Sequence, residues 1–522
     1  MMEEKKSTTE TKNLPPKIIA AIDIGTNSIR FAIAEAYPDG KFEMVEQFTQ
    51  AVWLGKDTFQ RGRLSSETMR AGIEILRRFR KLMDQYGVER LRAVATTAIR
   101  EASNADIFID RIRMATGIEI EVIDASEEIE YSVAALQETL DEDIQQAGKN
   151  VLFVNVGGGS TLLSVLCDKT VVNAQSLNIG AIRLREAYSS PEDTSQNAVV
   201  ILRHNIQDVL ASAETYFPFT GNDYFVAMGG DARFAARQVG HPSQFAGLTE
   251  VHLRDFDFFV ERVEKMDTQQ ICREFGIAFQ SAETTVPAML TYQEILRCCR
   301  MRSFLVSEVS MRHGLLANLA REVWNLENSY FQKDVLDSAK ALAQRFHVDI
   351  EHARATMNLA AKIFDNTISE HGLGPRYRLL LQVAAILQNS GKFISNRSFH
   401  KHSYYLISNS EIFGLSHNDT EMVAQTARYS FRSPPKPSHL AFLSLPRTSR
   451  VIISKLAAIL RIADALNRGE CPNPERIRFT RVGDDLTLLL PPDDDFLLKC
   501  RALETQGKMF EDVFGMRVLF DR

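Results

Sequence analysis

Residues 18–30, IIAAIDIGTNSIR, form an almost continuous apolar run that ends in an acid, a glycine and small polar residues. Such a run is typical of a β-strand buried on both faces and followed by a tight turn. Strand-like residues 29–36 and 42–48 come next, separated by Pro38-Asp39-Gly40, so a β-hairpin is predicted.

The residues after this hairpin alternate between helical and strand patterns. Apolar residues recur at helical spacing over 66–86, and a second helix is predicted near 104–115. Apolar runs at 91–96 and 118–123 predict strands, and a further helix begins near Ser126. This alternation predicts an α/β domain with a largely parallel sheet.

The opening pattern recurs after a polar segment at 141–150. Residues 151–161, VLFVNVGGGST, repeat the buried strand and the turn of small residues. Strand-like residues 162–166 and 171–177 then form a second hairpin. The sequence therefore predicts two successive α/β domains of one design, without a detectable sequence repeat.

The remaining third of the chain has a different character. From about residue 331, apolar residues recur at helical spacing in one segment after another, and the last stretch returns to strands at 477–482, 486–490 and 516–520 around a helix at 495–505. The predicted organisation is a flexible tail (1–16), α/β domain I (17–140), α/β domain II (141–325), a helical domain (326–472) and a small α+β domain (473–522).

The composition argues against two kinds of partner. The chain carries 61 Lys and Arg against 67 Asp and Glu, interspersed, whereas a nucleic-acid surface needs a basic excess. It contains no run of about 18 apolar residues and no apolar signal-peptide core. Six cysteines without metal or C-x-x-C spacing indicate reduced thiols. We expect a cytoplasmic protein with no nucleic-acid partner and no membrane association.

The two turns of small residues are candidate anion sites. Consecutive backbone N–H groups in such a turn form an anion-binding concavity, and hydroxyl groups add donors for phosphate oxygens. Neither turn matches the P-loop or the dinucleotide-binding fingerprint. Either turn alone is equally well explained as a tight turn that needs glycine. Two equivalent turns in successive domains suggest a cleft in which phosphate is held from both sides.

Four motifs in order make the pattern specific. They are DIGTNSIR (23–30), ATTAIREASN (95–104), VIDASEE (122–128) and VNVGGGST (154–161). Together they resemble the exopolyphosphatase / guanosine pentaphosphate phosphohydrolase (Ppx/GppA) family of the actin-like ATPase superfamily. The resemblance implies an α/β fold class: two actin-like (ribonuclease H-like) domains, an all-α HD-like domain and a small α+β C-terminal domain.

The resemblance also implies an activity, which is hydrolysis of the terminal phosphoanhydride of inorganic polyphosphate or guanosine pentaphosphate with Mg²⁺, by a homodimer. Glu128 matches the family's general base, Asp23 an acid that is a candidate metal ligand, and Arg100 the arginine of the second motif. The implied phosphate-binding residues are Thr26, Asn27, Ser28, Arg30, Gly157, Gly158, Gly159, Ser160, Thr161 and Arg312. Guanidinium groups suit bidentate contact with phosphate.

Two departures bear on catalysis. Where the family has acids in D-I-G-G-G-S-T-E, this chain has Asn155 and Leu162. Mg²⁺ prefers anionic oxygen ligands, so their loss is expected to lower activity by orders of magnitude while leaving phosphate binding possible. The alternative function is therefore a catalytically weak family member that binds polyphosphate or a guanosine alarmone as a sensor. An actin-like kinase is a third possibility, less favoured because no second-substrate domain is recognisable.

The predicted helical domain departs from its family pattern as well. Gln388 and Asn389 occupy the positions of a metal-binding His and acid, and amides are poor ligands for transition metals. Asp464 matches an acid typical of the module, but one acid does not make a metal site. His400 and His402 are read as loop or anion-contacting residues. We therefore predict no metal here and expect this domain to extend the substrate channel or form a dimer surface.

Overall fold

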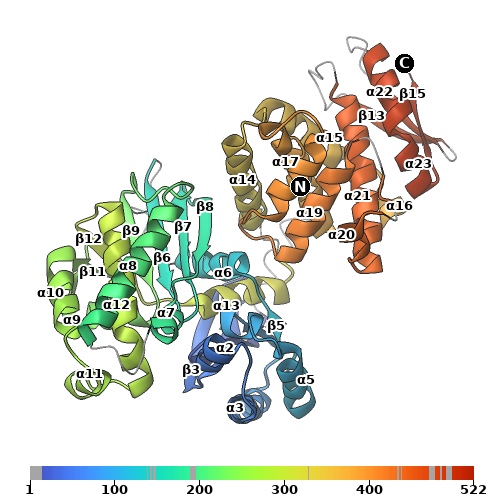
Figure 1. Cartoon of the computed structure of the whole chain (residues 1–522). Coiled ribbons are helices and arrows are strands. Elements are labelled where there is room, and N and C mark those ends of the chain that lie inside the picture. Colours follow the sequence, from blue (N-terminus) through green and yellow to red (C-terminus); the bar gives the residue numbers. More distant parts are fainter. Residues whose placement is uncertain are drawn as a thin grey trace. The chain divides into compact units, whose positions relative to one another are not determined.

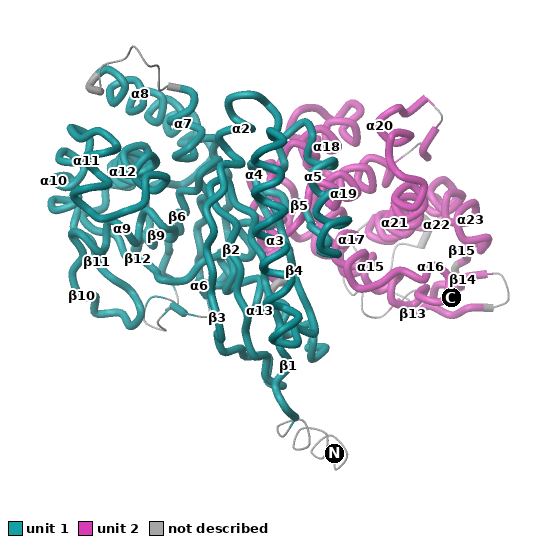
Figure 2. Tube along the Cα trace, turned by 90° about the horizontal axis from the view of Figure 1, so that it is seen from below, with its two compact units in different colours: residues 1–329 teal, residues 330–522 magenta. Residues whose placement is uncertain are grey.

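We describe the protein from a computed structural model of the whole chain. The structure describes residues 14–137, 139–140, 144, 148–188, 195–326, 329–431, 434–436, 438–468, 477–482, 485–489 and 496–521. Most of the predicted tail and of the polar segment 141–150 lies outside these residues. The chain forms two compact units, residues 1–329 and 330–522, which are coloured separately in Figure 2.

The first sheet of unit 1 contains five strands in the order β3-β2-β1-β4-β5. These are β1 (Lys17–Ile24), β2 (Ser28–Ala36), β3 (Phe42–Ala51), β4 (Arg90–Ala95) and β5 (Glu121–Val122). All five were predicted. The sheet is nevertheless mixed rather than largely parallel, because the hairpin strands β1, β2 and β3 pair antiparallel and only β4 pairs parallel, with β1 and β5.

The second sheet repeats this arrangement and extends it. Its order is β10-β11-β12-β9-β6-β7-β8. The strands are β6 (Asn150–Val156), β7 (Thr161–Cys167), β8 (Thr170–Leu177), β9 (Tyr224–Met228), β10 (Gly240–Pro242), β11 (Leu248–His252) and β12 (Ser303–Ser307). The hairpin β6-β7-β8 is antiparallel, and β9 pairs parallel with both β6 and β12. The structural repeat and the α/β fold class with two actin-like domains are therefore confirmed.

Helices cover both sheets (Figure 1). In chain order they are α2 (Leu54–Arg61), α3 (Ser66–Tyr86), α4 (Thr97–Arg100), α5 (Ala105–Thr116), α6 (Ala125–Gln137), α7 (Ala181–Tyr188), α8 (Ser195–Ala213), α9 (Gly230–Val239), α10 (Leu253–Val263), α11 (Thr268–Phe275), α12 (Phe279–Cys299) and α13 (Met311–Val323). Helix α3, which was predicted, shows how the sequence determines a helix. Ser65 caps its first turn and Gly87 ends it in a left-handed conformation. Its apolar residues Leu76 and Phe79 are buried in the core.

Unit 2 is a set of helices followed by a small sheet. Its elements are α14 (Ser329–Arg345), α15 (Ile350–Asn366), α16 (Ile368–His371), α17 (Pro375–Leu387), the 3-10 helix η2 (Ser390–Phe393), α18 (Phe399–Ser408), α19 (His417–Tyr429), α20 (Leu440–Leu443), α21 (Arg447–Leu466), α22 (Phe496–Gln506), α23 (Lys508–Phe514) and strands β13 (Arg478–Val482), β14 (Asp485–Leu489) and β15 (Arg517–Asp521). The three C-terminal strands and α22 were predicted, whereas α23 was not.

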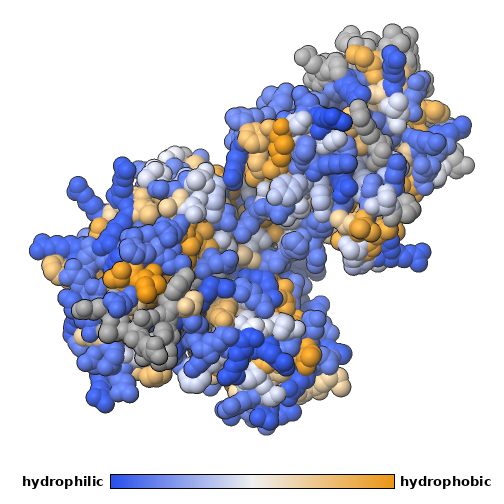
Figure 3. Space-filling model, in the orientation of Figure 1, coloured by the Kyte–Doolittle hydropathy of each residue, from blue (hydrophilic) through white to orange (hydrophobic). Residues whose placement is uncertain are grey.

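Surface and cysteine features agree with the composition. Among the described residues, no helix is long and apolar enough to cross a membrane. The face drawn in Figure 3 is mainly hydrophilic, with small separate apolar areas. Among the cysteines within the described residues, Cys167, Cys272, Cys298 and Cys299 are free thiols.

Candidate active site

A cleft of about 570 Å³ lies in unit 1, where the turns after β1 and β6 face each other. It is lined by all but two of the predicted site residues, namely Asp23, Thr26, Asn27, Ser28, Arg30, Glu128, Gly157, Gly158, Gly159, Ser160 and Arg312. The two domains contribute one turn each, so the cleft has the two-sided architecture that the repeat predicts.

The two turns close in the same way. The N–H of Gly25 donates to the Ser28 carbonyl oxygen at 3.0 Å, and the N–H of Gly157 donates to the Ser160 carbonyl oxygen at 2.9 Å. The turns also approach each other closely, because a Cβ atom at Gly158 would lie 2.8 Å from the Cβ of Thr26. Glycine at 158 is therefore required by this contact, in addition to any role in phosphate binding.

Glu128 and Arg100 form an ion pair. Glu128 lies in the first turn of α6 and is 8% exposed. The Nη1 of Arg100 donates to Glu128 Oε1 at 2.9 Å and to the Ile123 carbonyl oxygen at 2.6 Å, while Nη2 donates to the Thr97 hydroxyl at 3.1 Å. Arg100 does not line the cleft; it holds the carboxylate of Glu128 in place from behind.

The pKa of Glu128 is raised to about 7, because burial, together with the negative charges of Asp23 and Asp124, outweighs the stabilisation of the carboxylate by Arg100. A carboxyl group with a pKa near neutrality can accept a proton efficiently from water at physiological pH. The environment of Glu128 is therefore chemically suited to a general base.

Arginines surround the opposite side of the cleft. Arg30 donates to Asp23 at 3.1 Å and is partly exposed. Arg312, in the first turn of α13, is 8% exposed; its Nη1 donates to the Phe31 and Phe48 carbonyl oxygens, but its Nε has no partner among the described residues. Burial lowers the pKa of Arg312 to about 10, and Arg30 lowers it further. A buried cation with an unused donor favours an anionic ligand.

Thr161 is the second predicted residue that does not line the cleft. It is fully buried, and its hydroxyl donates to the Ile179 carbonyl oxygen at 2.8 Å. The Ser160 hydroxyl lies 3.3 Å from that of Thr97, which also contacts Arg100. This chain of contacts connects the second turn to the guanidinium that holds Glu128.

The two departures from the family pattern lie side by side. Asn155 and Leu162 are directly opposite each other on the antiparallel strands β6 and β7, and both line the cleft. The positions that lack carboxylates thus form one contiguous patch of the cleft wall.

Three charged residues of the cleft were not predicted as site residues. Asp231 and Arg233, in the first turn of α9, and Arg237, in the same helix, line it. Burial raises the pKa of Asp231 to about 7, against the stabilising effect of Arg30 and Arg233. Arg233 donates to the Val309 carbonyl oxygen at 3.2 Å. A sequence signal was available, because Asp231 follows directly on Gly229-Gly230, a small-residue turn after an apolar run.

The carboxylates of the cleft determine how it could bind Mg²⁺. Within the described residues, its lining carboxylates are those of Asp23, Glu128 and Asp231, and no cluster of three His, Cys, Asp or Glu side chains is preassembled around one point. Mg²⁺ commonly keeps several waters and uses only one or two carboxylates together with substrate phosphates. The residues present fit this mode of binding and do not fit an all-protein cage.

In unit 2, Gln388 donates to Asp464 at 3.4 Å, and Arg468 pairs with Asp464 at 3.7 Å. The carboxylate is thus engaged by an amide and a guanidinium. His400 and His402 lie in the first turn of α18, so the prediction that they belong to a loop is wrong. That they contact an anion, and that this unit binds no metal, stay predictions.

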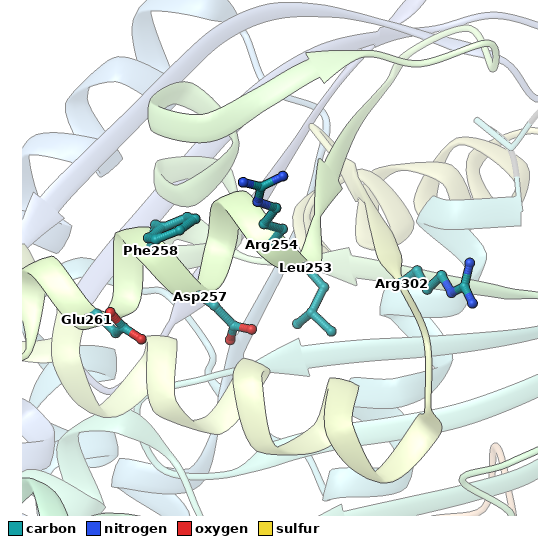
Figure 4. Close-up of a pocket in the computed structure, with 6 residues that line it drawn as sticks. All are labelled: Leu253, Arg254, Asp257, Phe258, Glu261 and Arg302. Carbon is teal, nitrogen blue, oxygen red and sulfur yellow. The ribbon is translucent and has the colours of Figure 1, made fainter.

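A second pocket of about 470 Å³ lies apart from these residues. Figure 4 shows Leu253, Arg254, Asp257, Phe258 and Glu261 projecting from α10, with Arg302 beside them. It contains none of the predicted site residues, and its side chains offer no nucleophile or base paired with an anion-binding turn.

Fold and site together are those of a protein with two actin-like domains and a cleft lined by one turn of small residues from each. The Ppx/GppA phosphatase family model matches residues 33–322, and the model for Ppx/GppA phosphatase domain III matches residues 336–506. The chain belongs to the Ppx/GppA phosphatase family.

Several individual proteins are similar over much of their length. Guanosine-5'-triphosphate,3'-diphosphate pyrophosphatase of Vibrio atlanticus is 23% identical over 495 residues, which cover 92% of this chain and 93% of the relative. The protein of the same name from Aliivibrio fischeri is 24% identical over 466 residues, covering 86% and 88%. An exopolyphosphatase structure from Cytophaga hutchinsonii aligns with a TM-score of 0.52 at 22% identity, covering 60% of this chain and 99% of that chain, and supports the fold.

Proposed function

We propose that this protein hydrolyses the terminal phosphoanhydride of inorganic polyphosphate, guanosine pentaphosphate or both. The observation that carries the proposal is Glu128: a buried carboxyl group with a pKa near neutrality, held by Arg100 at the wall of a cleft lined by two turns of small residues. The family membership and the names of the relatives support this substrate class.

In this proposal each residue acts through its own chemistry. Glu128 accepts a proton from the attacking water, while the backbone N–H groups of both turns and the guanidinium of Arg312 hold the phosphates in line. Mg²⁺, when bound with Asp23, would neutralise charge on the phosphoryl oxygens. Arg100 positions Glu128 and keeps its pKa from rising further.

Phosphate release in the presence of Mg²⁺ tests the proposal. The full chain is incubated separately with polyphosphate and with guanosine pentaphosphate, and inorganic phosphate is measured over time. Release from at least one substrate is expected, and the ratio of kcat/KM values assigns the preferred one. Absence of release from both would contradict the proposal.

The second candidate, a sensor that binds these anions with little turnover, is favoured by the paired Asn155 and Leu162. Its signature is tight binding of polyphosphate or guanosine pentaphosphate, measured by calorimetry, without phosphate release. If Asn155→Asp combined with Leu162→Glu raised a weak turnover strongly, the missing acids would be the cause of the weakness. High turnover in the wild type would exclude this candidate.

A further inference from the structure

Asp231 occupies a distinctive place in the second sheet. The strand β9 runs parallel to β6, with Met228 directly beside Asn155, and the chain then continues through Gly229 and Gly230 into Asp231. Because the carboxyl ends of adjacent parallel strands meet at one edge, Asp231 emerges at the edge where the cleft lacks an acid.

Gly229 brings the two chain segments close together. It has a φ of +121°, and a Cβ atom there would lie 3.0 Å from the side-chain oxygen of Asn155. Only glycine tolerates both the conformation and this approach. Leu162, Asn155 and Met228 thus form one row across β7, β6 and β9, and Asp231 follows at the β9 end of that row.

The electrostatics connect Asp231 with Asp23. Arg30 donates to Asp23, and the same guanidinium stabilises the ionised form of Asp231 across the cleft. The Thr284 hydroxyl, which donates to the Ser281 carbonyl oxygen at 3.1 Å, also lines the cleft and lowers the pKa of Asp231. One carboxylate from each domain is therefore stabilised by the positive charge of the same arginine.

The unused Nε of the buried Arg312 is an independent sign that a ligand belongs here. A buried guanidinium N–H without a partner favours binding of an anion. A phosphate substrate would bind together with its divalent cation in the same cleft. An aspartate that served only helix α9 would need neither this location nor a cleft lined by Asn155.

We infer that Asp231, at the start of α9, supplies a carboxylate ligand from domain II for the divalent cation. It would replace the carboxylate that Asn155, as an amide, cannot provide. The inference rests on the proposed function for its substrate class, but its test does not depend on turnover. Asp231 and Asp23 would each contribute one oxygen ligand, directly or through water, and the substrate phosphates would contribute others.

The test is Mn²⁺ binding by the full-length protein, with free Mn²⁺ measured by electron paramagnetic resonance. Mn²⁺ shares the oxygen preference of Mg²⁺ and is directly observable. Asp231→Asn is expected to weaken binding about tenfold or more. Adding Asn155→Asp to Asp231→Asn is expected to restore most of the affinity, because it returns the acid to the neighbouring strand end.

Two comparisons make the result specific. In the wild-type background, Asn155→Asp is expected to strengthen Mn²⁺ binding less than it does in the Asp231→Asn variant. The reason is that neighbouring residues which serve the same ligand have non-additive effects. The matched control Asp257→Asn, in the pocket of Figure 4, is expected to leave binding unchanged. Thermal unfolding of each variant checks that it is folded.

Unchanged Mn²⁺ affinity in a folded Asp231→Asn variant, or no Mn²⁺ binding by the wild type, would overturn the inference. A double variant no better than Asp231→Asn would overturn the replacement of Asn155. These outcomes are separate from phosphate release. If the wild type showed no turnover but its Mn²⁺ binding depended on Asp231, the proposed function would be contradicted and this inference would still hold.

Discussion

Replacing Arg100 tests whether this arginine controls the pKa of Glu128, the proposed general base. Arg100→Gln removes the cation that lies 2.9 Å from Glu128 and stabilises its carboxylate. The pair is mostly shielded from solvent, with 24% of the Arg100 side chain and 10% of the Glu128 side chain exposed, so screening is limited. Loss of an opposite charge at this distance raises a carboxyl pKa by about one to three pH units.

Because the pKa of Glu128 lies near neutrality, a change in it alters the pH dependence of kcat/KM in an accessible pH range. With a pKa of about 7, Glu128 is ionised in roughly half of the molecules at pH 7, so kcat/KM of the wild type should rise with pH through neutrality. In Arg100→Gln the midpoint should move upward by at least about one pH unit, with a loss at pH 7 of about fivefold or more. The two enzymes should converge at alkaline pH.

The assay is phosphate release as a function of pH, with Arg100→Lys as the control that keeps the positive charge. The carboxyl ¹³C shift of labelled glutamate reports the same midpoint without turnover. If Arg100→Gln lowered kcat/KM equally at every pH and left the midpoint in place, Arg100 would act on the phosphate instead of on Glu128, and the reasoning would be refuted.

Three further predictions concern the cleft. Gly158→Ala should destabilise the protein by about 1–3 kcal/mol in urea unfolding, because the added Cβ meets Thr26 at 2.8 Å; Gly230→Ala, in the same unit and with nothing within 4 Å of the added Cβ, is the control. Arg312→Met should weaken substrate binding by about tenfold or more, since it removes the buried guanidinium whose Nε has no partner among the described residues. Equal affinity in calorimetry would argue against that role. Mg²⁺ removal by a chelator should abolish turnover and leave the melting temperature within about 2 °C, because the cleft holds no preassembled cage.

Much of the fold could be predicted because its strands are unambiguous. The run around Ile22 and the run around Phe153 each form an interior strand of a sheet, where burial on both faces requires continuous apolar residues. The proportion of parallel pairing was misjudged, since pairing depends on which strands become neighbours and not on local pattern alone. Helix α23 was missed because it is only seven residues long and follows α22 directly.

The candidate site was predicted where motif residues face the cleft, as at Asp23 and Glu128. Thr161 shows what a motif cannot predict. It belongs to the glycine-rich motif 154–161, but its hydroxyl points inward and donates to a backbone carbonyl, and only the fold determines that orientation. Asp231 and Arg233 were missed because their importance comes from the parallel pairing of β9 with β6, which brings distant segments to one edge.

The comparison of wild type with Glu128→Gln tests the central claim most directly. Phosphate release from polyphosphate and from guanosine pentaphosphate is measured with Mg²⁺ at a pH above 7, where Glu128 is ionised. We predict release by the wild type and a loss of about a hundredfold or more in Glu128→Gln, with substrate binding retained. Equal rates for the two proteins, or no release by the wild type, would contradict the account.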